Sequence, residues 1–137
     1  MKTKTTDLSR FNRCLIRRKL VANTPEERVR QALLRTMVEL LGYPRSLISV
    51  ERGIGARRTD IVCYTPDMLA LLLVECKAEA IDESAIEQAL GYNEQIGAPF
   101  VCVASANNVL TLWFENKKRV SVPFLPKFRE LSDATGL

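Results

Sequence analysis

The chain of 137 residues contains no histidine, and its four cysteines lie far apart without a Cys-x-x-Cys pair. Because zinc sites use closely spaced Cys and His, and nucleophilic triads commonly use His as the base, we expect neither kind of site. No apolar run is long enough to span a bilayer, and the N-terminus Met-Lys-Thr-Lys-Thr-Thr lacks the apolar core of a signal peptide. We therefore expect a cytoplasmic protein with no membrane partner.

The content of 47% hydrophobic and 26% charged residues is typical of one compact domain with a substantial core. The net charge of +4 is unevenly distributed: residues 1–35 carry ten bases and three acids, whereas residues 79–94 carry five acids and no base. A basic surface favours a polyanion such as nucleic acid, although basic stretches also serve solubility alone. We expect a basic arm at 1–23, a core domain at 24–115 and a tail at 116–137.

The segment 57–77 consists of two short apolar runs around a turn at 65–68, which predicts a β-hairpin. Side chains alternate along a strand, so Glu75 and Lys77 share one face of the second run. Asp60 occupies the first run and lies beside Glu75 if the register allows. Two carboxylates and an ammonium would then share one patch.

Neighbouring carboxylates on a half-buried sheet repel each other unless a cation neutralises them. Mg²⁺ suits such a pair, because it takes oxygen ligands and is commonly held by one or two carboxylates plus substrate phosphate. Lys77 would orient a water or stabilise charge in the transition state. The alternative is an ordinary cross-strand ion pair on a solvated sheet face. The aliphatic run before Glu75, together with Asp60 one strand earlier, favours the metal site.

A first helix is predicted from Thr24 as N-cap and Pro25 at the first helical position to about Leu41. Glu26 falls within roughly 40° of the apolar stripe and Glu27 points away from it. We therefore expect Glu26 to face the core, and interaction with the helix dipole explains a glutamate there equally well. The apolar stripe is expected at Val29, Leu33, Thr36/Met37 and Leu40.

A second helix is predicted from Asp82 to about Ile96, closed by Gly97, with Gln88 and Tyr92 on one of its faces. The tail is expected to be irregular, apart from a short helical turn at 127–131. The remaining predicted strands are 46–52, 100–105 and 109–114.

This order, a helix, three strands with carboxylates on the second and third, a helix and two strands, resembles the core of the PD-(D/E)xK nucleases. Asp60 fills the Asp position, Thr59 stands where the name has Pro, and Glu75-Cys76-Lys77 is the (D/E)xK triplet. Over about residues 11–115 the chain is similar to the N-terminal nuclease domain of type I restriction enzyme R subunits. The matching stretches are 24–31, 57–62, 73–78, 88–93 and 99–101; the fourth contains the Gln-x-x-x-Tyr motif of the RecB-like branch.

The resemblance implies an α/β fold with a restriction-endonuclease-like core, that is, a mixed central sheet flanked by helices. It also implies a Mg²⁺-dependent (or Mn²⁺-dependent) endodeoxyribonuclease that hydrolyses phosphodiester bonds. Asp60, Glu75 and the backbone carbonyl of Cys76 would hold the metal, and Lys77 would position the attacking water. The other implied roles are metal or water binding by Glu26, strand orientation by Gln88 and Tyr92, and phosphate contacts by Arg57 and Arg58.

The chain departs from the R subunits in having no Walker motif or helicase motor, so ATP-driven translocation and methylation-dependent restriction do not carry over. DNA is the expected partner, together with a second copy of the chain or a separate motor or specificity subunit. The alternative function is a non-catalytic nucleic-acid-binding module or partner subunit that keeps the nuclease fold. A purely structural interaction domain fits the basic arm poorly.

Overall fold

The computed structural model describes residues 11–13, 16, 20–22, 24–52 and 59–136, with side chains described for residues 16, 24–50 and 61–136. Its helices are α1 (Pro25–Glu39), α2 (Glu83–Ile96) and α3 (Phe128–Ala134), with a 3₁₀ turn η2 at Arg45–Leu47. Its strands are β1 (Phe11–Arg13), β2 (Leu20–Ala22), β3 (Ile48–Arg52), β4 (Thr59–Tyr64), β5 (Ala70–Cys76), β6 (Phe100–Ala104), β7 (Val109–Glu115) and β8 (Lys118–Val122).

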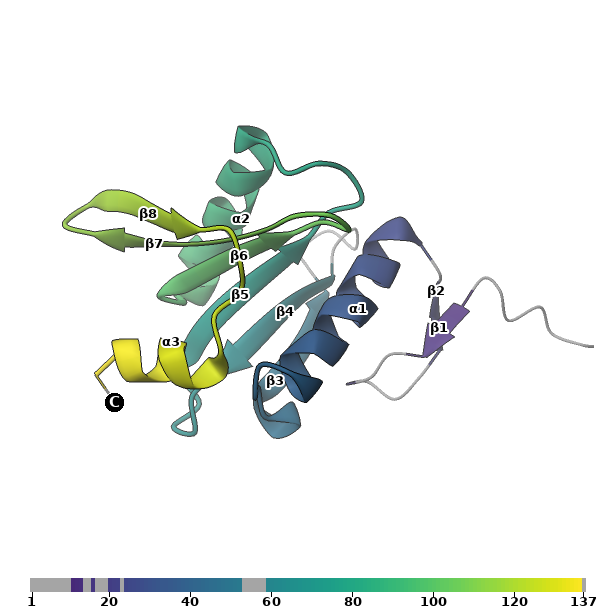
Figure 1. Cartoon of the computed structure of the whole chain (residues 1–137), viewed down its shortest axis with the longest axis horizontal. Coiled ribbons are helices and arrows are strands. Elements are labelled where there is room, and N and C mark those ends of the chain that lie inside the picture. Colours follow the sequence, from purple (N-terminus) through teal and green to yellow (C-terminus); the bar gives the residue numbers. More distant parts are fainter. Residues whose placement is uncertain (1–10, 14–15, 17–19, 23, 53–58, 137) are drawn as a thin grey trace, which may run out of the picture.

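Strands β3 to β8 form one sheet in the order β3-β4-β5-β6-β7-β8, and helices cover both of its faces (Figure 1). Neighbouring strands are antiparallel except for β5 and β6, which are parallel and are connected through α2. A parallel pair needs a crossover of this length, because a tight turn can join antiparallel strands only. The predicted mixed α/β fold is confirmed.

The β4–β5 hairpin has the expected turn and a defined register. Ile61 pairs with Val74 and Val62 pairs with Leu73, with an irregularity between Cys63 and Tyr64. The turn is closed by a backbone hydrogen bond from the Thr65 amide to the Leu69 carbonyl at 2.8 Å. The described side chains of both strands are mostly buried, so a register slip would move apolar side chains to the wrong face.

The core has two parts because alternate side chains of the buried strands point to opposite faces. Helix α1 covers the face that carries Ile61, Leu72 and Val74. Helix α2 packs on the other face, with Ala85, Ile86 and Ala89 against strands β6 and β7. The caps of α2 are those predicted: the Asp82 carboxylate accepts from the Ala85 amide at 2.8 Å, and Gly97 ends the helix with φ of 75°.

The orientation of α1 differs from the prediction. Leu40, assigned to the inward stripe, is 74% exposed. Leu33 and Met37 of the predicted stripe are buried and Val29 packs against the core, but the buried face also carries polar residues in the first half of the helix. The buried residues of α1 are Glu27, Arg30, Gln31, Leu33, Leu34 and Met37.

The tail is more ordered than predicted. Residues 118–122 form β8, which pairs with β7, and α3 follows where a short helical turn was expected. Tyr43 ties α3 to the core: its hydroxyl donates to the Pro126 carbonyl at 2.7 Å, and its ring meets Phe128 edge-on at 5.6 Å. The prediction of an irregular tail was therefore wrong: β7 and β8 form a tight hairpin, whose turn residues Asn116 and Lys117 both have positive φ, 50° and 65°.

At the N-terminus, β1 and β2 pair as a small antiparallel ladder. Among the residues described, no helix has the length and apolarity that a bilayer crossing requires.

Candidate active site

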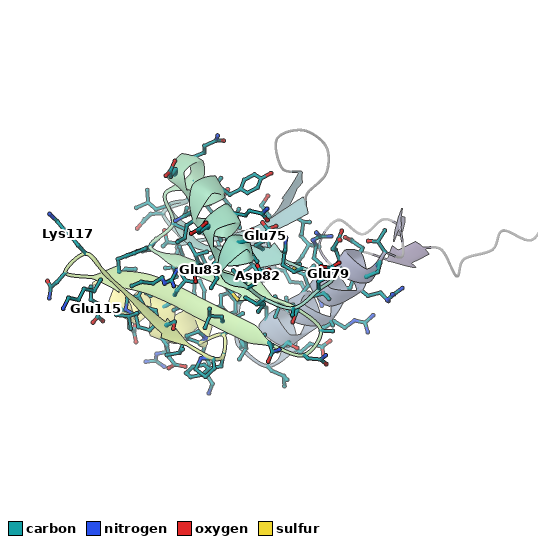
Figure 2. The ribbon with its side chains drawn as sticks, turned by 90° about the horizontal axis from the view of Figure 1, so that it is seen from above. Glu75, Glu79, Asp82, Glu83, Glu115 and Lys117 are labelled. Carbon is teal, nitrogen blue, oxygen red and sulfur yellow. The ribbon has the colours of Figure 1, made fainter. Side chains whose placement is uncertain are left out.

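The candidate site lies at the carboxyl end of β5. Glu75 is only 2% exposed and pairs in the parallel register with Val103 of β6. By strand alternation it shares a face with Leu73, which packs in the cluster beside α2. Figure 2 shows Glu75 near α2, with Asp82 and Glu83 at the start of that helix. A carboxylate in so buried a place is costly unless polar groups or a cation offset its charge.

Lys77 follows directly after β5 and joins three elements. Its backbone amide donates to the Ala104 carbonyl at the end of β6, at 2.8 Å. Its ammonium donates to Oε1 of Gln88 on α2, at 3.1 Å. The side chain is partly exposed, so the ammonium reaches solvent while its position is held by the helix. The charge of Lys77 is therefore directed to the end of the sheet where Glu75 is buried.

Asp60 is placed by its backbone alone, because its side chain lies outside the part that the structure describes. Its backbone pairs with Glu51 of β3. The β4–β5 register of Ile61 with Val74, continued by one residue, puts Asp60 opposite Glu75, and both positions lie within their strands. Arg57 and Arg58 lie outside the described residues.

The α1 glutamate that turns inward is Glu27, which is 5% exposed, whereas Glu26 is exposed. The prediction that Glu26 faces the interior was wrong by one position. Glu27 accepts a hydrogen bond from Nε2 of Gln31 at 3.1 Å and forms an ion pair with Arg30. Its amide donates to the Thr24 hydroxyl at 3.1 Å, as expected for an N-cap.

This cluster of Glu27, Arg30 and Gln31 is a buried polar network at the N-terminal half of α1. A buried carboxylate is tolerated here because an opposite charge and an amide donor satisfy it. The signal in the sequence was the spacing, because residues at i, i+3 and i+4 share a helix face. Glu27, Arg30 and Gln31 have this spacing, and Leu34 continues the same face one turn later.

Tyr92 and Cys76 have structural surroundings. Tyr92 is partly buried and packs against the cluster of Val62, Leu73 and Ala98 beneath α2. The Cys76 side chain is buried in the core on the α1 face, where a free cysteine packs as a small apolar residue. The carbonyl of Cys76 lies between the Glu75 and Lys77 positions in the backbone, at the end of β5.

The other buried cysteines are unsuited to nucleophilic or metal chemistry. Burial raises the pKa of the Cys102 thiol to about 12, with a smaller opposing effect from Thr111. Burial and the neighbouring Cys102 raise the pKa of Cys63 further. Both thiols are therefore neutral at physiological pH, and the thiolate is the form that binds metals.

Among the side chains described, no three His, Cys, Asp or Glu groups lie close enough together to hold a metal. The Asp60 carboxylate is not among those side chains. A hollow of about 210 Å³ lies next to the site, between α1 and the β6–β7 turn. It is lined by Val29, Ala32, Leu33, Thr36, Ala104, Ser105, Ala106 and Val109.

The sequence matches the family described as type I restriction enzyme R protein N terminus (HSDR_N) over residues 25–128. This match covers most of the chain, and the chain belongs to this family. Membership associates it with restriction systems. Comparisons with curated proteins and with solved structures gave no significant match.

Proposed function

We propose that this chain is a metal-dependent endodeoxyribonuclease domain of a restriction system. The observation that supports it most is the hydrogen bond between Lys77 and Gln88, two residues after the buried Glu75. A triplet Glu-x-Lys on an ordinary solvated sheet face would leave its carboxylate in water. Here the carboxylate is buried and the lysine is held by a helix, as a preorganised site requires.

The metal would be held by Asp60, Glu75 and the carbonyl of Cys76. These are hard oxygen donors at adjoining positions of β4 and β5, and such donors suit Mg²⁺ or Mn²⁺. When bound, the metal would supply Lewis-acid stabilisation of the phosphate and a water that ionises more readily. The buried surroundings of Glu75 fit this role, because a cation offsets the cost of a desolvated carboxylate.

The side chains around the carboxylates have separable roles. Lys77 would orient the attacking water and stabilise charge on the phosphate, and Gln88 would keep its ammonium in place. Glu27 would take the place of Glu26 as the inward carboxylate of α1, and its ion pair with Arg30 would hold it in position. Tyr92 would act mainly by packing α2 against the sheet.

DNA is the proposed substrate, with Arg57 and Arg58 as phosphate contacts next to Asp60 in the chain. The excess of ten bases over three acids in residues 1–35 supports binding to a polyanion. Such contacts release counterions, so we expect affinity without sequence preference that falls steeply with salt. A separate motor or specificity subunit is the other proposed partner.

The decisive experiment is a nuclease assay on duplex, single-stranded and branched DNA with Mg²⁺, Mn²⁺ or EDTA. We expect cleavage with a divalent metal, none with EDTA, and loss of cleavage in Asp60→Asn and Glu75→Gln. Glu79→Gln is the matched control, because Glu79 is exposed and follows the site by four residues. It should leave activity unchanged.

A melting experiment tests metal binding separately. A cation that binds only the native state raises its stability, so Mg²⁺ or Mn²⁺ should raise the Tm of the wild type and of Glu79→Gln, but not that of Glu75→Gln. DNA binding without cleavage under any metal, together with a Tm indifferent to millimolar metal, would support the non-catalytic DNA-binding module instead.

A further inference from the structure

Strand β8 is an edge of the six-stranded sheet in the part of the chain that the structure describes. Its residues are exposed or partly exposed along the whole strand. An edge strand presents backbone N–H and C=O groups on its outer side, which form a template for another strand. In Figure 2, Glu115 and Lys117 mark the tip of the β7–β8 hairpin, and this tip lies well away from Glu75. A partner on this edge would leave the candidate active site accessible.

Beside this edge lies a hollow of about 710 Å³, bounded by β6, β7, β8 and α3. Its walls are apolar and aromatic: Phe100 is buried and meets Trp113 edge-on at 5.8 Å. Phe124 in its lining is 52% exposed, and the neighbouring Phe114 is 55% exposed. Large apolar side chains gathered around a concavity mark an interaction site more often than scattered ones do.

The charged residues that line this hollow are two glutamates, Glu115 and Glu130. Both are exposed, and Glu115 accepts a hydrogen bond from the Trp113 indole at 3.0 Å. The hollow therefore suits an occupant that combines apolar side chains with a positive charge. Strand β8 itself has this chemistry, since Lys118, Val120 and Val122 alternate along it.

We propose that a second copy of this chain docks here, with the two β8 strands pairing antiparallel about Val120. Residues opposite each other in a sheet share a face, and β7 pairs Trp113 with Val120 and Glu115 with Lys118. Lys118, Val120 and Val122 are therefore on the face of the hollow. In the proposed register Lys118 lies opposite Val122 of the partner subunit, at the rim of the partner's hollow, where Glu130 of the partner subunit supplies the opposite charge.

Charge selects this register over its neighbours. A pairing centred on Arg119 would put the Arg119 side chains of the two copies opposite each other, which is unfavourable. In the pairing about Val120, Arg119 faces Ser121 of the partner subunit. Arg119 is also neutralised within its own chain, since its guanidinium holds both oxygens of Glu83 at 2.6 and 3.0 Å. Such a pairing is isologous, so it closes as a dimer and does not propagate.

Crosslinking tests the register, and this inference does not rest on the proposed nuclease activity. Val120→Cys places two thiols across the two-fold axis, so mild oxidation should link most of the protein as a disulfide dimer. Val122→Cys is the matched control, because its thiol would face Lys118 of the partner subunit; it should give no more crosslink than the wild type. Equal crosslinking of both variants, or of neither, would overturn the register.

Sedimentation or light scattering tests the interface itself. The wild type should show about twice the chain mass of 15.4 kDa at micromolar to millimolar concentration. Lys118→Glu should weaken the dimer on the order of tenfold, and the pair Lys118→Glu with Glu130→Lys should restore it. Arg45→Glu is the control for charge, because Arg45 is exposed beside β3 at the opposite edge of the sheet.

The apolar contribution is tested by Phe124→Glu, with Leu40→Glu as the control for an exposed apolar side chain outside the hollow. We expect loss of the dimer in the first and no change in the second, at unchanged Tm in both. A monomer at every concentration would overturn the proposal, with Lys118 then acting as a guard against edge pairing. A dimer that neither Lys118→Glu nor Phe124→Glu weakens would also overturn it.

Discussion

The ammonium of Lys77 donates a hydrogen bond to Oε1 of Gln88 at 3.1 Å, and this contact fixes the end of β5 to the middle of α2. It joins two motifs that are eleven residues apart in the sequence. A lysine has four rotatable bonds, so a partner on a rigid helix reduces the freedom of its charge. The contact therefore makes the position of the ammonium a property of the fold.

The first prediction follows from this contact and compares the contributions of Lys77 and Gln88 to kcat. Lys77→Met should reduce kcat by about 10²- to 10³-fold if the ammonium stabilises the transition state. Gln88→Ala should cause a smaller loss, because the charge is retained but less well placed. Both side chains are at least partly exposed, so the free energy of unfolding should change by no more than about 0.5 kcal/mol. Single-turnover cleavage and urea unfolding measure the two effects; Gln88→Ala more damaging than Lys77→Met would contradict the assignment.

The second prediction compares the two glutamates at the start of α1. Glu27→Ala leaves the Arg30 charge buried without this partner and should cost about 3 to 5 kcal/mol in the free energy of unfolding. Glu26→Ala removes an exposed side chain and at most a favourable interaction with the helix dipole, about 0.3 to 1 kcal/mol. Urea denaturation of both variants measures the difference. Equal costs would show that burial does not distinguish these positions.

The third prediction concerns the hydroxyl of Tyr43, which donates to the Pro126 carbonyl at 2.7 Å in the core. Tyr43→Phe keeps the ring and its contact with Phe128 but leaves the buried carbonyl without this donor. We expect a loss of about 1 to 3 kcal/mol in the free energy of unfolding. Amide hydrogen exchange should localise the loss to α3 and the segment before it. Unchanged stability would mean that solvent replaces the hydroxyl.

The fourth prediction concerns alkaline pH. Burial raises the pKa of the Cys102 thiol from its ordinary value of 9.0 to about 12. The unfolded chain then loses this proton at lower pH than the folded chain, so the stability from this group is complete below pH 9 and is lost progressively between pH 9 and 12. The slope approaches about 1.4 kcal/mol per pH unit for one thiol.

Cys102→Ala should remove this share of the alkaline destabilisation, whatever its effect on stability at pH 7. The measurement is the slope of unfolding free energy against pH from 8 to 10.5. Burial likewise raises the pKa of the Cys63 thiol, so Cys63→Ala should flatten the curve in the same direction. Identical slopes in wild type and both variants would show that the thiols titrate normally in the fold.

Local signals in the sequence determined the order and kind of the elements from α1 to β7. Thr24 and Pro25 start α1, Asp82 and Gly97 bound α2, and the turn at 65–68 joins β4 to β5. Each of these signals acts through hydrogen bonds or φ angles within a few residues, so no distant contact is needed to read them. The triplet Glu75-Cys76-Lys77 was identified in the same way.

The tertiary structure decided which faces meet. The inward glutamate of α1 is Glu27, because Arg30 and Gln31 lie on the same buried face and bind its carboxylate. A pattern of apolar residues alone does not reveal a buried face made of polar residues. The Lys77–Gln88 contact depends on how α2 packs on the sheet. Packing depends on contacts between residues that are far apart in the chain. These features are therefore set by the fold as a whole.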